Sequence, residues 1–354
     1  MLQNASVVPV RTIGLDLGDR VSHVYAIDVA GVCVDTRTIP TTAAGIARYF
    51  SSDVRWRVVC EVGTHSPWIA RALDALGHEV FVANPSAMYG RRRRRRNDAL
   101  DAEFLARQGR ADPTLLHAIQ HRRVTAQTDL ALLHARDQLV AVRTKLINHV
   151  RGTVKATGAR LPASSAEAFV TRATPAVPPV LLPAVSPVLE TITALTQTIR
   201  AYDAQVRTLI ATTYPVAQRL QQPAGVGPLT ALAFVLLVDD PARFKQSRTV
   251  GAYFGLVPKL DESSTATPQL RITKTGDEYG RRLLVSAAHY ILGPFGPPCD
   301  LRRHGEAISA RGGANAKKRA VVAVARKLAV LLHRLWVSDQ PYVPEYQPQR
   351  RRAA

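Results

Sequence analysis

The chain has little cysteine and no long apolar run. Its three cysteines, Cys33, Cys60 and Cys299, are scattered along 354 residues. They lack the density of a disulfide framework and the spacing of a zinc site, which suits a reducing cytosol. The longest mainly apolar run, 229–238, is far shorter than the ~20 residues that a spanning helix needs. We therefore expect no membrane partner, and no amino-terminal segment has the pattern of a secretory signal.

Acidic residues are also few relative to basic ones. The chain carries 27 Asp and Glu against 47 Lys and Arg, a formal net charge of +20. Such an excess bears on partners rather than on fold. Nucleic acid is the polyanion that fits best, because neutralised phosphates release counterions. An anionic membrane surface is the rival partner, but the sequence has no lipid-anchor motif. The 46% hydrophobic content and the length predict a folded chain of two or three domains.

The amino-terminal third alternates strand-like and helix-like segments. Tight turns separate three apolar, β-branched segments, which predicts antiparallel pairing. Helix and strand patterns then follow in alternation, which predicts a mixed sheet flanked by helices. The predicted strands are 13–17, 22–28, 32–38, 57–60 and 79–83, and the predicted helices are 41–50 and 66–76.

Four acidic residues occupy informative places on this scaffold. Asp16 lies inside the first strand, with its side chain opposite in direction to those of its apolar neighbours. Glu61 follows the carboxyl end of a later strand, and Asp98 and Asp101 share one face at the start of a helix. If the four carboxylates converge, they need cations, and hard oxygen ligands favour Mg²⁺ or Mn²⁺. Two such ions ~4 Å apart would support phosphoryl transfer.

Simpler interpretations of the same residues remain open. A strand aspartate is often solvated, and aspartates early in a helix favour its dipole. The arginine run that precedes Asp98 is either a solvated loop or a clamp for phosphates. It consists of Arg91, Arg92, Arg93, Arg94, Arg95 and Arg96.

The middle of the chain predicts an antiparallel helical arm. Segment 122–155 contains no proline and repeats apolar pairs every seven residues, and 188–210 has the apolar spacing of a coiled-coil seam. Between them, 161–187 is rich in proline and should form a tip that continues neither helix. The seam fits two outcomes equally: packing within the chain, or a homo-oligomer joined through the coiled coil.

The carboxyl-terminal half combines a glycine turn with basic residues. Gly225 and Gly227 flank an apolar residue between two helices, like a helix-hairpin-helix that grips DNA backbone, although a plain helical corner is the alternative. A polar loop from 258 to 268 contains Ser263 and Ser264, and loop serines are common. The basic candidates for nucleic-acid binding are Lys274, Arg281, Arg282, Lys317 and Lys318.

Taken together, five segments resemble one known family. They read IGLDLGDRVSHVYAID, CEVGTHSPW, NPSAMYGRRRRRRNDALDAEFLAR, PAGVGPLTALAF and GLVPKLDESSTATPQLRITKTGDEYGRRLLV. Their order is that of the insertion sequence 110 family of DEDD transposases, which is related to the Piv-type DNA invertases. The resemblance covers nearly the whole chain, from 13 to about 336.

The resemblance implies a domain order and site residues. It implies an α/β RuvC-like (ribonuclease H fold) catalytic domain over 8–118 and a coiled-coil arm over 119–214. A mainly α transposase domain with the helix-hairpin-helix and the serine would cover 215–338, and a basic tail 339–354. The acidic tetrad maps onto Asp16, Glu61, Asp98 and Asp101. The catalytic serine maps onto Ser263, five residues after Pro258, while Ser264 replaces the glycine usual in the family.

The resemblance also implies a reaction and partners. The serine would form a covalent phosphoserine link with DNA, helped by Mg²⁺ or Mn²⁺ at the tetrad, and a 3′-hydroxyl would later reverse the link. A structured guide RNA would pair with donor and target DNA. The protein would be a dimer or tetramer in the bacterial cytoplasm, acting at the nucleoid. The alternatives are a RuvC-like nuclease that hydrolyses DNA with metal-activated water, and a nucleic-acid binder without activity.

Overall fold

The structure is a computed structural model that describes residues 11–85, 97–259 and 270–345, and its chain divides into two units after Arg122. The first unit contains β1 (Thr12–Asp16), β2 (Val21–Ile27), β3 (Cys33–Pro40), α1 (Ala43–Phe50), β4 (Arg57–Glu61), α2 (Ser66–Ala75), β5 (Glu79–Ala83) and α3 (Asp98–Ala111). The second contains α4 (Val124–Ala156), α5 (Phe169–Ala173), α6 (Leu182–Thr212), α7 (Pro215–Arg219), α8 (Pro228–Val238), α9 (Val250–Tyr253), α10 (Glu278–Leu292), α11 (Asp300–Ser309) and α12 (Ala316–Ser338).

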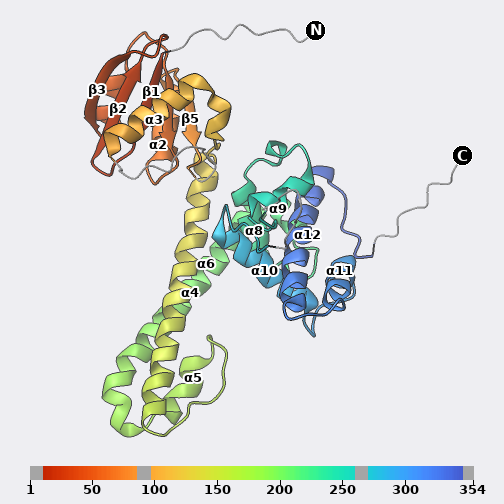
Figure 1. Ribbon diagram of the computed structural model, residues 1–354. Coiled ribbons are helices and arrows are strands. Elements are labelled where there is room, and N and C mark those ends of the chain that lie inside the picture. The colour runs from red at the N-terminus through yellow and green to blue at the C-terminus, as the bar shows by residue number, and fades with distance from the viewer. Residues whose placement is uncertain (1–10, 86–96, 260–269, 346–354) are drawn as a thin grey trace, which may run out of the picture. The chain divides into compact units, whose positions relative to one another are not determined.

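The first unit is built on a mixed five-stranded sheet with the order β3-β2-β1-β4-β5 (Figure 1). The pairs β1–β2 and β2–β3 are antiparallel, whereas β4 pairs parallel to β1 and β5 parallel to β4. The predicted mixed sheet flanked by helices is therefore confirmed. Each predicted strand is present, with ends shifted by at most two residues.

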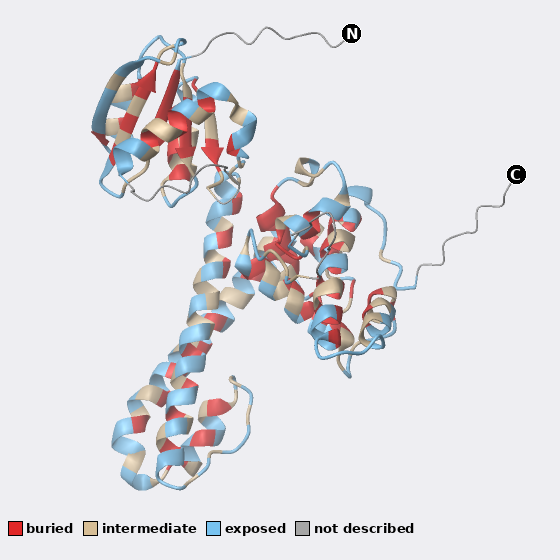
Figure 2. Cartoon of the chain, viewed as in Figure 1, coloured by how far each residue is buried: buried red, intermediate tan, exposed pale blue. Residues whose placement is uncertain are grey.

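One face of the sheet is covered by α1 and α2. The alternation of β1 sends Ile13 and Leu15 into a core with Ile46 of α1 and Ile69 of α2, and all four side chains are buried. Thr42 begins α1, since its side chain accepts a hydrogen bond from the Gly45 backbone N–H. The red interior of this unit in Figure 2 marks this core.

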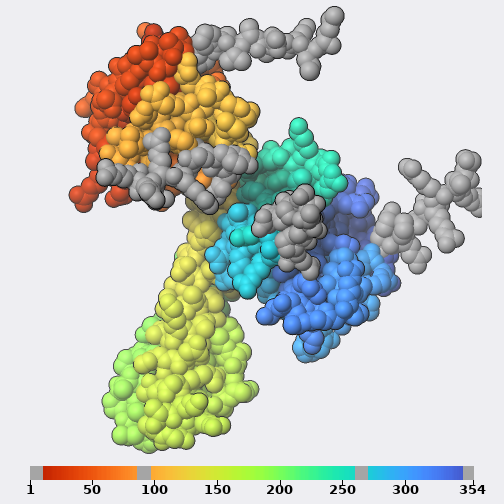
Figure 3. Space-filling view, viewed as in Figure 1, coloured from red at the N-terminus to blue at the C-terminus, as the bar shows by residue number. Residues whose placement is uncertain are grey.

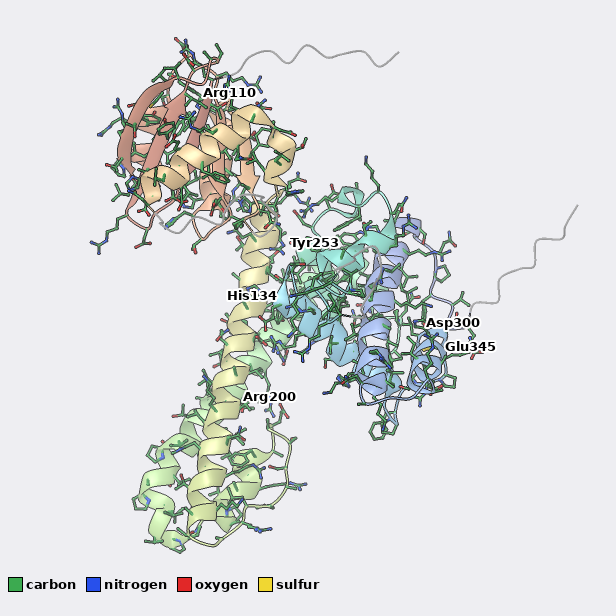
Figure 4. The ribbon with its side chains drawn as sticks, viewed as in Figure 1. Arg110, His134, Arg200, Tyr253, Asp300 and Glu345 are labelled. Carbon is green, nitrogen blue, oxygen red and sulfur yellow. The ribbon has the colours of Figure 1, made fainter. Side chains whose placement is uncertain are left out.

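The other face is covered by α3, which approaches β1 unusually closely. A Cβ atom on Gly14 would lie 1.9 Å from the Ala102 carbonyl oxygen, and one on Gly109 would lie 2.3 Å from a methyl carbon of Val59. Only glycine fits at either position, because any side chain would overlap the opposing atoms. At the far end of α3, Arg110 donates to the Val29 and Ala30 carbonyl oxygens (Figure 4). The helix is therefore fixed on the sheet at both ends.

The second unit contains the predicted antiparallel helical arm, made by α4 and α6. Arg136 of α4 bonds Asp203 of α6 at 2.7 Å, and Arg143 bonds Thr196 at 3.3 Å, so the two helices run in opposite directions. Three of the predicted seam residues, Ile192, Ile199 and Val206, are buried. The seam thus packs within the chain. Supercoiling of the pair and assembly through it stay predictions.

The tip of the arm differs from the prediction. Segment 161–187 was expected to continue neither helix, but α6 begins at Leu182 and includes Pro183 and Pro187. Pro183 fits because backbone N–H groups of a first turn have no helical acceptor, whereas Pro187 removes one hydrogen bond from inside the helix. The rest of the tip folds as well, because Phe169 of α5 packs in a small core with residues of both long helices. Figure 3 shows a tip broader than the stem.

One helix of the described residues is long and apolar enough to cross a membrane by length and composition alone, Pro179–Thr212. A comparison of uninterrupted apolar runs does not reveal this segment, because threonine and alanine separate its larger apolar residues. Most of its buried side chains belong to cores shared with α4. The absence of a membrane partner stays a prediction.

The remaining helices share one large core. Every residue of α8 from Ala231 to Val238 is buried. This helix packs with α10 and the base of the arm, in a core that also contains residues of α12. At the start of α4, the Arg123 backbone N–H and guanidinium both donate to the Asp239 carboxylate just after α8. The arm is thus anchored in the carboxyl-terminal core.

We expect Gly14→Val to destabilise the first unit by at least about 2 kcal/mol, because its side chain would overlap the Ala102 carbonyl oxygen and force α3 off the sheet. Thermal unfolding measures the effect. Gly63→Ala is the matched control, since a Cβ atom there meets nothing within 4 Å. An unchanged unfolding temperature for Gly14→Val would show that α3 does not need this close approach.

Candidate active site

Three elements of the first unit carry the four predicted acidic residues. Asp16 is the last residue of β1 and Glu61 the last of β4, and these strands are parallel neighbours with Leu15 opposite Cys60. Both carboxylates therefore lie at the same edge of the sheet. Asp98 and Asp101 occupy the first turn of α3, which Asn97 caps by accepting from the Ala99 N–H.

The contact at Gly14 explains why α3 brings its aspartates to that edge. Gly14 stands two residues before Asp16 on β1, so both lie on the face that α3 covers. Ala102, whose carbonyl oxygen approaches Gly14, directly follows Asp101. The first turn of α3 is thereby placed beside the carboxyl end of β1.

The raised pKa of Asp16 reflects this convergence of acidic residues. Burial raises the pKa of its carboxyl group, and the negative charges of Asp98, Asp101 and Glu61 raise it further, to about 6. His23 acts in the opposite direction and lowers this pKa. Three of the predicted acids thus act on the fourth, which means that the structure brings all four into one neighbourhood.

The donor chemistry of this neighbourhood fits a hard divalent cation, since carboxylate oxygens are the preferred ligands of Mg²⁺ and Mn²⁺. The mutual repulsion that raises the pKa of Asp16 is also what a cation would relieve. In the arrangement described, however, the side chains are not gathered on one point. Across residues 11–85, 97–259 and 270–345, no three His, Cys, Asp or Glu side chains form a metal-binding group.

Two histidines at this edge were not anticipated from the sequence. His23 pairs with Asp16 across the β1–β2 ladder, and its Nε2 lies 3.6 Å from an Asp98 oxygen. His65 accepts at Nδ1 from the Trp68 indole N–H, so its proton is on Nε2, 3.4 Å from Asp19. The hairpin register could have identified His23, since a tight turn after Asp16 fixes which residue lies opposite it.

The predicted nucleic-acid residues are found mostly in the second unit. Gly225 has φ +79°, a conformation that favours glycine, and Gly227 caps α8. The preceding helix, α7, has only five residues, so the helix-hairpin-helix stays a prediction. The arginines 91–96, Ser263 and Ser264 lie outside the described residues.

The basic candidates in this unit differ in whether their side chains are available to bind DNA. Lys274, Lys317 and Lys318 are exposed, and the last two lie in the first turn of α12. Arg281 instead donates to the Phe254 carbonyl oxygen, and Arg282 forms a 2.6 Å ion pair with Asp137 of α4. These two arginines therefore already support the fold, which the sequence alone did not indicate.

Known proteins match the chain along nearly its whole length. One family profile, the DEDD transposase of IS110, matches residues 13–158, and a second, described as "Transposase IS116/IS110/IS902 family", matches 217–298. The transposase for insertion sequence element IS1111A of Coxiella burnetii is 29% identical over 95% of this chain and 92% of its own length. A probable family 20 transposase of Pseudomonas aeruginosa is 28% identical over 94% and 98%, respectively.

A third relative, the transposase for insertion sequence element IS1328 of Yersinia enterocolitica, is 26% identical over 80% of this chain and 84% of its own length. The first profile ends just beyond α4 and contains all four acids, whereas the second contains the glycine turn, Ser263 and α10. Both halves point to the same proteins, and the chain belongs to the IS110 family of insertion-sequence transposases.

Proposed function

We propose that this transposase cuts and rejoins DNA through a covalent serine intermediate, at a site where Asp16, Glu61, Asp98 and Asp101 hold a divalent cation. The raised pKa of Asp16, caused by burial and by the three other carboxylates, is the observation that supports it most directly. The sheet order β3-β2-β1-β4-β5 with α3 on one face supports the RuvC-like catalytic domain that the family resemblance implies. Bound Mg²⁺ or Mn²⁺ would stabilise the charge that develops during phosphoryl transfer.

In this proposal Ser263 is the nucleophile. Its Oγ attacks the phosphorus of a DNA phosphodiester, an O–P bond forms, and the bond to the 3′-oxygen breaks. The serine proton leaves to a base, and the departing 3′-oxygen takes one up. A 3′-hydroxyl of the partner strand then attacks the phosphoserine and releases Ser263. The number of phosphoester bonds is unchanged, so rejoining needs no ATP.

The partners follow from charge and from the arm. The exposed side chains of Lys274, Lys317 and Lys318 support phosphate binding. Lys317 and Lys318 lie in the first turn of α12, where the helix dipole disfavours a positive charge that has no anionic partner. A structured guide RNA would supply sequence recognition by base pairing, with the protein contacting backbone and shape. A dimer or tetramer through the helical arm completes the proposal, although the buried seam of α6 already packs on α4.

The first prediction concerns the cation. Mg²⁺ or Mn²⁺ should raise the unfolding temperature of the wild-type protein, because a ligand of the folded state stabilises it. The increase should grow as the pH rises through about 6, where Asp16 loses the proton that competes with the cation. Without a cation, the stability of the protein changes with pH in the opposite direction. Since the pKa of Asp16 in the folded protein lies above the ordinary aspartate value of 3.8, stability falls between pH 3.8 and about 6 as the pH rises.

Alanine at Asp16, Glu61, Asp98 or Asp101 should cancel the cation effect and abolish strand cleavage, while DNA binding persists. Asp19→Asn is the matched control, because this carboxylate is 93% exposed and lies outside the tetrad. Cleavage in EDTA, or full cleavage by any two of the alanine variants, would refute the site.

A second prediction concerns Arg91–Arg96. A neutral linker of equal length should weaken DNA binding and flatten its salt dependence, because each phosphate contact contributes ~0.9 to the log–log slope. Fluorescence anisotropy over a range of salt concentrations measures both. Neutralising only Arg91–Arg93 should reduce the slope more than neutralising the exposed Arg160, Arg200 and Arg207 of the arm, which removes equal charge. Equal slopes for the two triple variants would mean that the run acts only through net charge.

The third prediction separates a serine recombinase from a hydrolytic nuclease. Wild-type protein, quenched with denaturant on a suicide DNA substrate, should yield DNA attached to the peptide that contains Ser263. Ser263→Ala should lose strand exchange and the adduct but retain cation and DNA binding, because only a hydroxyl is removed. Ser264→Ala is the matched control and should be much milder. Normal cleavage by Ser263→Ala without an adduct would establish hydrolysis, and an inactive Ser264→Ala would move the nucleophile by one residue.

A further inference from the structure

A cavity of about 540 Å³ opens on the second unit, between the glycine turn before α8 and the last turns of α10. Its lining includes Gln221, Gly225, Thr230, Ser286, Tyr290 and Pro297. The volume is within the ~300–1,000 Å³ typical of small-ligand sites. The lining combines a ring, aliphatic groups and side chains that can donate and accept hydrogen bonds, so an aromatic ligand with a polar edge fits it.

Two aromatic side chains at this place are unusually exposed. Tyr290 lines the cavity and is 48% exposed, and Phe295, in the loop after α10, is 81% exposed. The Tyr290 ring lies close to Gly225, since a Cβ atom on that glycine would lie 3.2 Å from a ring carbon. Most phenylalanines of the described residues are buried or half-buried, as expected for side chains that gain most from leaving water. Phe295 therefore differs from the other phenylalanines of the described residues in leaving its ring available to a partner.

The loop that carries Phe295 is held rigidly rather than left mobile. The Arg302 guanidinium donates from Nη1 to the carbonyl oxygens of Gly296 at 2.7 Å and Gly293 at 2.8 Å. Its Nε donates to Glu306 at 2.8 Å, which fixes the arginine itself. A Cβ atom on Gly296 would lie 2.2 Å from the Ile291 carbonyl oxygen, so the loop also lies tightly against the end of α10. The backbone that carries the exposed ring thus needs little further ordering when the ring binds a partner.

The neighbouring surface is polar rather than apolar. The exposed side of α10 that leads to Tyr290 presents Ser286, His289 and Arg282, whose guanidinium pairs with Asp137. A protein partner would be expected to meet a larger continuous apolar patch. Aromatic rings interleaved with polar groups instead suit unpaired nucleotides, whose bases stack on the rings while their edges form hydrogen bonds. In a duplex the base faces are already stacked and are not accessible.

We propose that this surface holds two consecutive unpaired bases of the DNA substrate, one inside the cavity beside Tyr290 and its neighbour stacked on Phe295. Gln221, Thr230 and Ser286 would form hydrogen bonds with the edge of the base in the cavity. The inference rests on the DNA-processing function proposed above and adds to it a site for an opened strand. Stacking on an aromatic ring accepts every base, so the site would grip the strand without selecting sequence.

The test uses the full-length protein and a single-stranded DNA oligonucleotide that carries 5-iodouracil. Irradiation should crosslink the DNA to peptides containing Phe295 or Tyr290. Phe295→Ala should weaken single-strand binding about 5- to 150-fold, the equivalent of one stacked base, and leave duplex binding within about twofold. Phe295→Trp should retain the affinity that Phe295→Leu loses. Val180→Ala, at an 80% exposed apolar residue of the arm, is the matched control and should change nothing.

Unchanged single-strand affinity in both Phe295→Ala and Tyr290→Ala would overturn the inference. Crosslinks from an RNA oligonucleotide of the same sequence, without any from DNA, would overturn the assignment to DNA. Self-association that is lost in Phe295→Ala would identify a second copy as the occupant. If these outcomes appear while the Ser263 adduct still forms, the inference fails and the proposed function stands. If the wild-type protein binds neither duplex nor single-stranded DNA, both the inference and the proposed function are wrong.

Discussion

The candidate site depends on the close approach of α3 to β1 at Gly14. Strand and helix carry residues that are far apart in sequence, and their main chains meet where glycine removes the side chain. Because Gly14 precedes Asp16 by two residues and Ala102 follows Asp101, this contact fixes the distance between acids of the two elements. The site is therefore a consequence of packing. Asp16 is half-buried because the helix covers it, and its pKa rises for the same reason.

In the second unit, ion pairs between elements add to close glycine contacts in fixing the helices. Arg123 binds Asp239 where α4 begins, Arg136 binds Asp203 between α4 and α6, and Arg282 ties α10 to Asp137. Partly exposed pairs of this kind contribute little stability, but they define register and direction. Several arginines of a strongly basic chain are thus occupied internally. The charge available for DNA is smaller than the sequence count suggests.

Much of the fold could be predicted from the sequence because local patterns decide it. Alternating apolar residues predicted the strands, and tight turns predicted their antiparallel pairing. The seven-residue spacing of apolar pairs predicted the long helices. The tip of the arm could not be predicted, because a proline near a helix start is accepted when packing of Phe169 and its neighbours holds the segment. The roles of Arg281 and Arg282 were also out of reach, since each depends on a partner distant in sequence.

The acidic and the basic residues of this chain have opposite electrostatic effects on DNA. Four carboxylates repel a phosphate, and Asp98, whose side chain is 71% exposed, would face it directly. The net charge of +20 attracts the polyanion as a whole, but an attraction spread over the surface does not cancel a local repulsion beyond the ~10 Å screening length. A divalent cation held by the four carboxylates, as proposed above, would place positive charge between the acids and a phosphate and so reduce this repulsion.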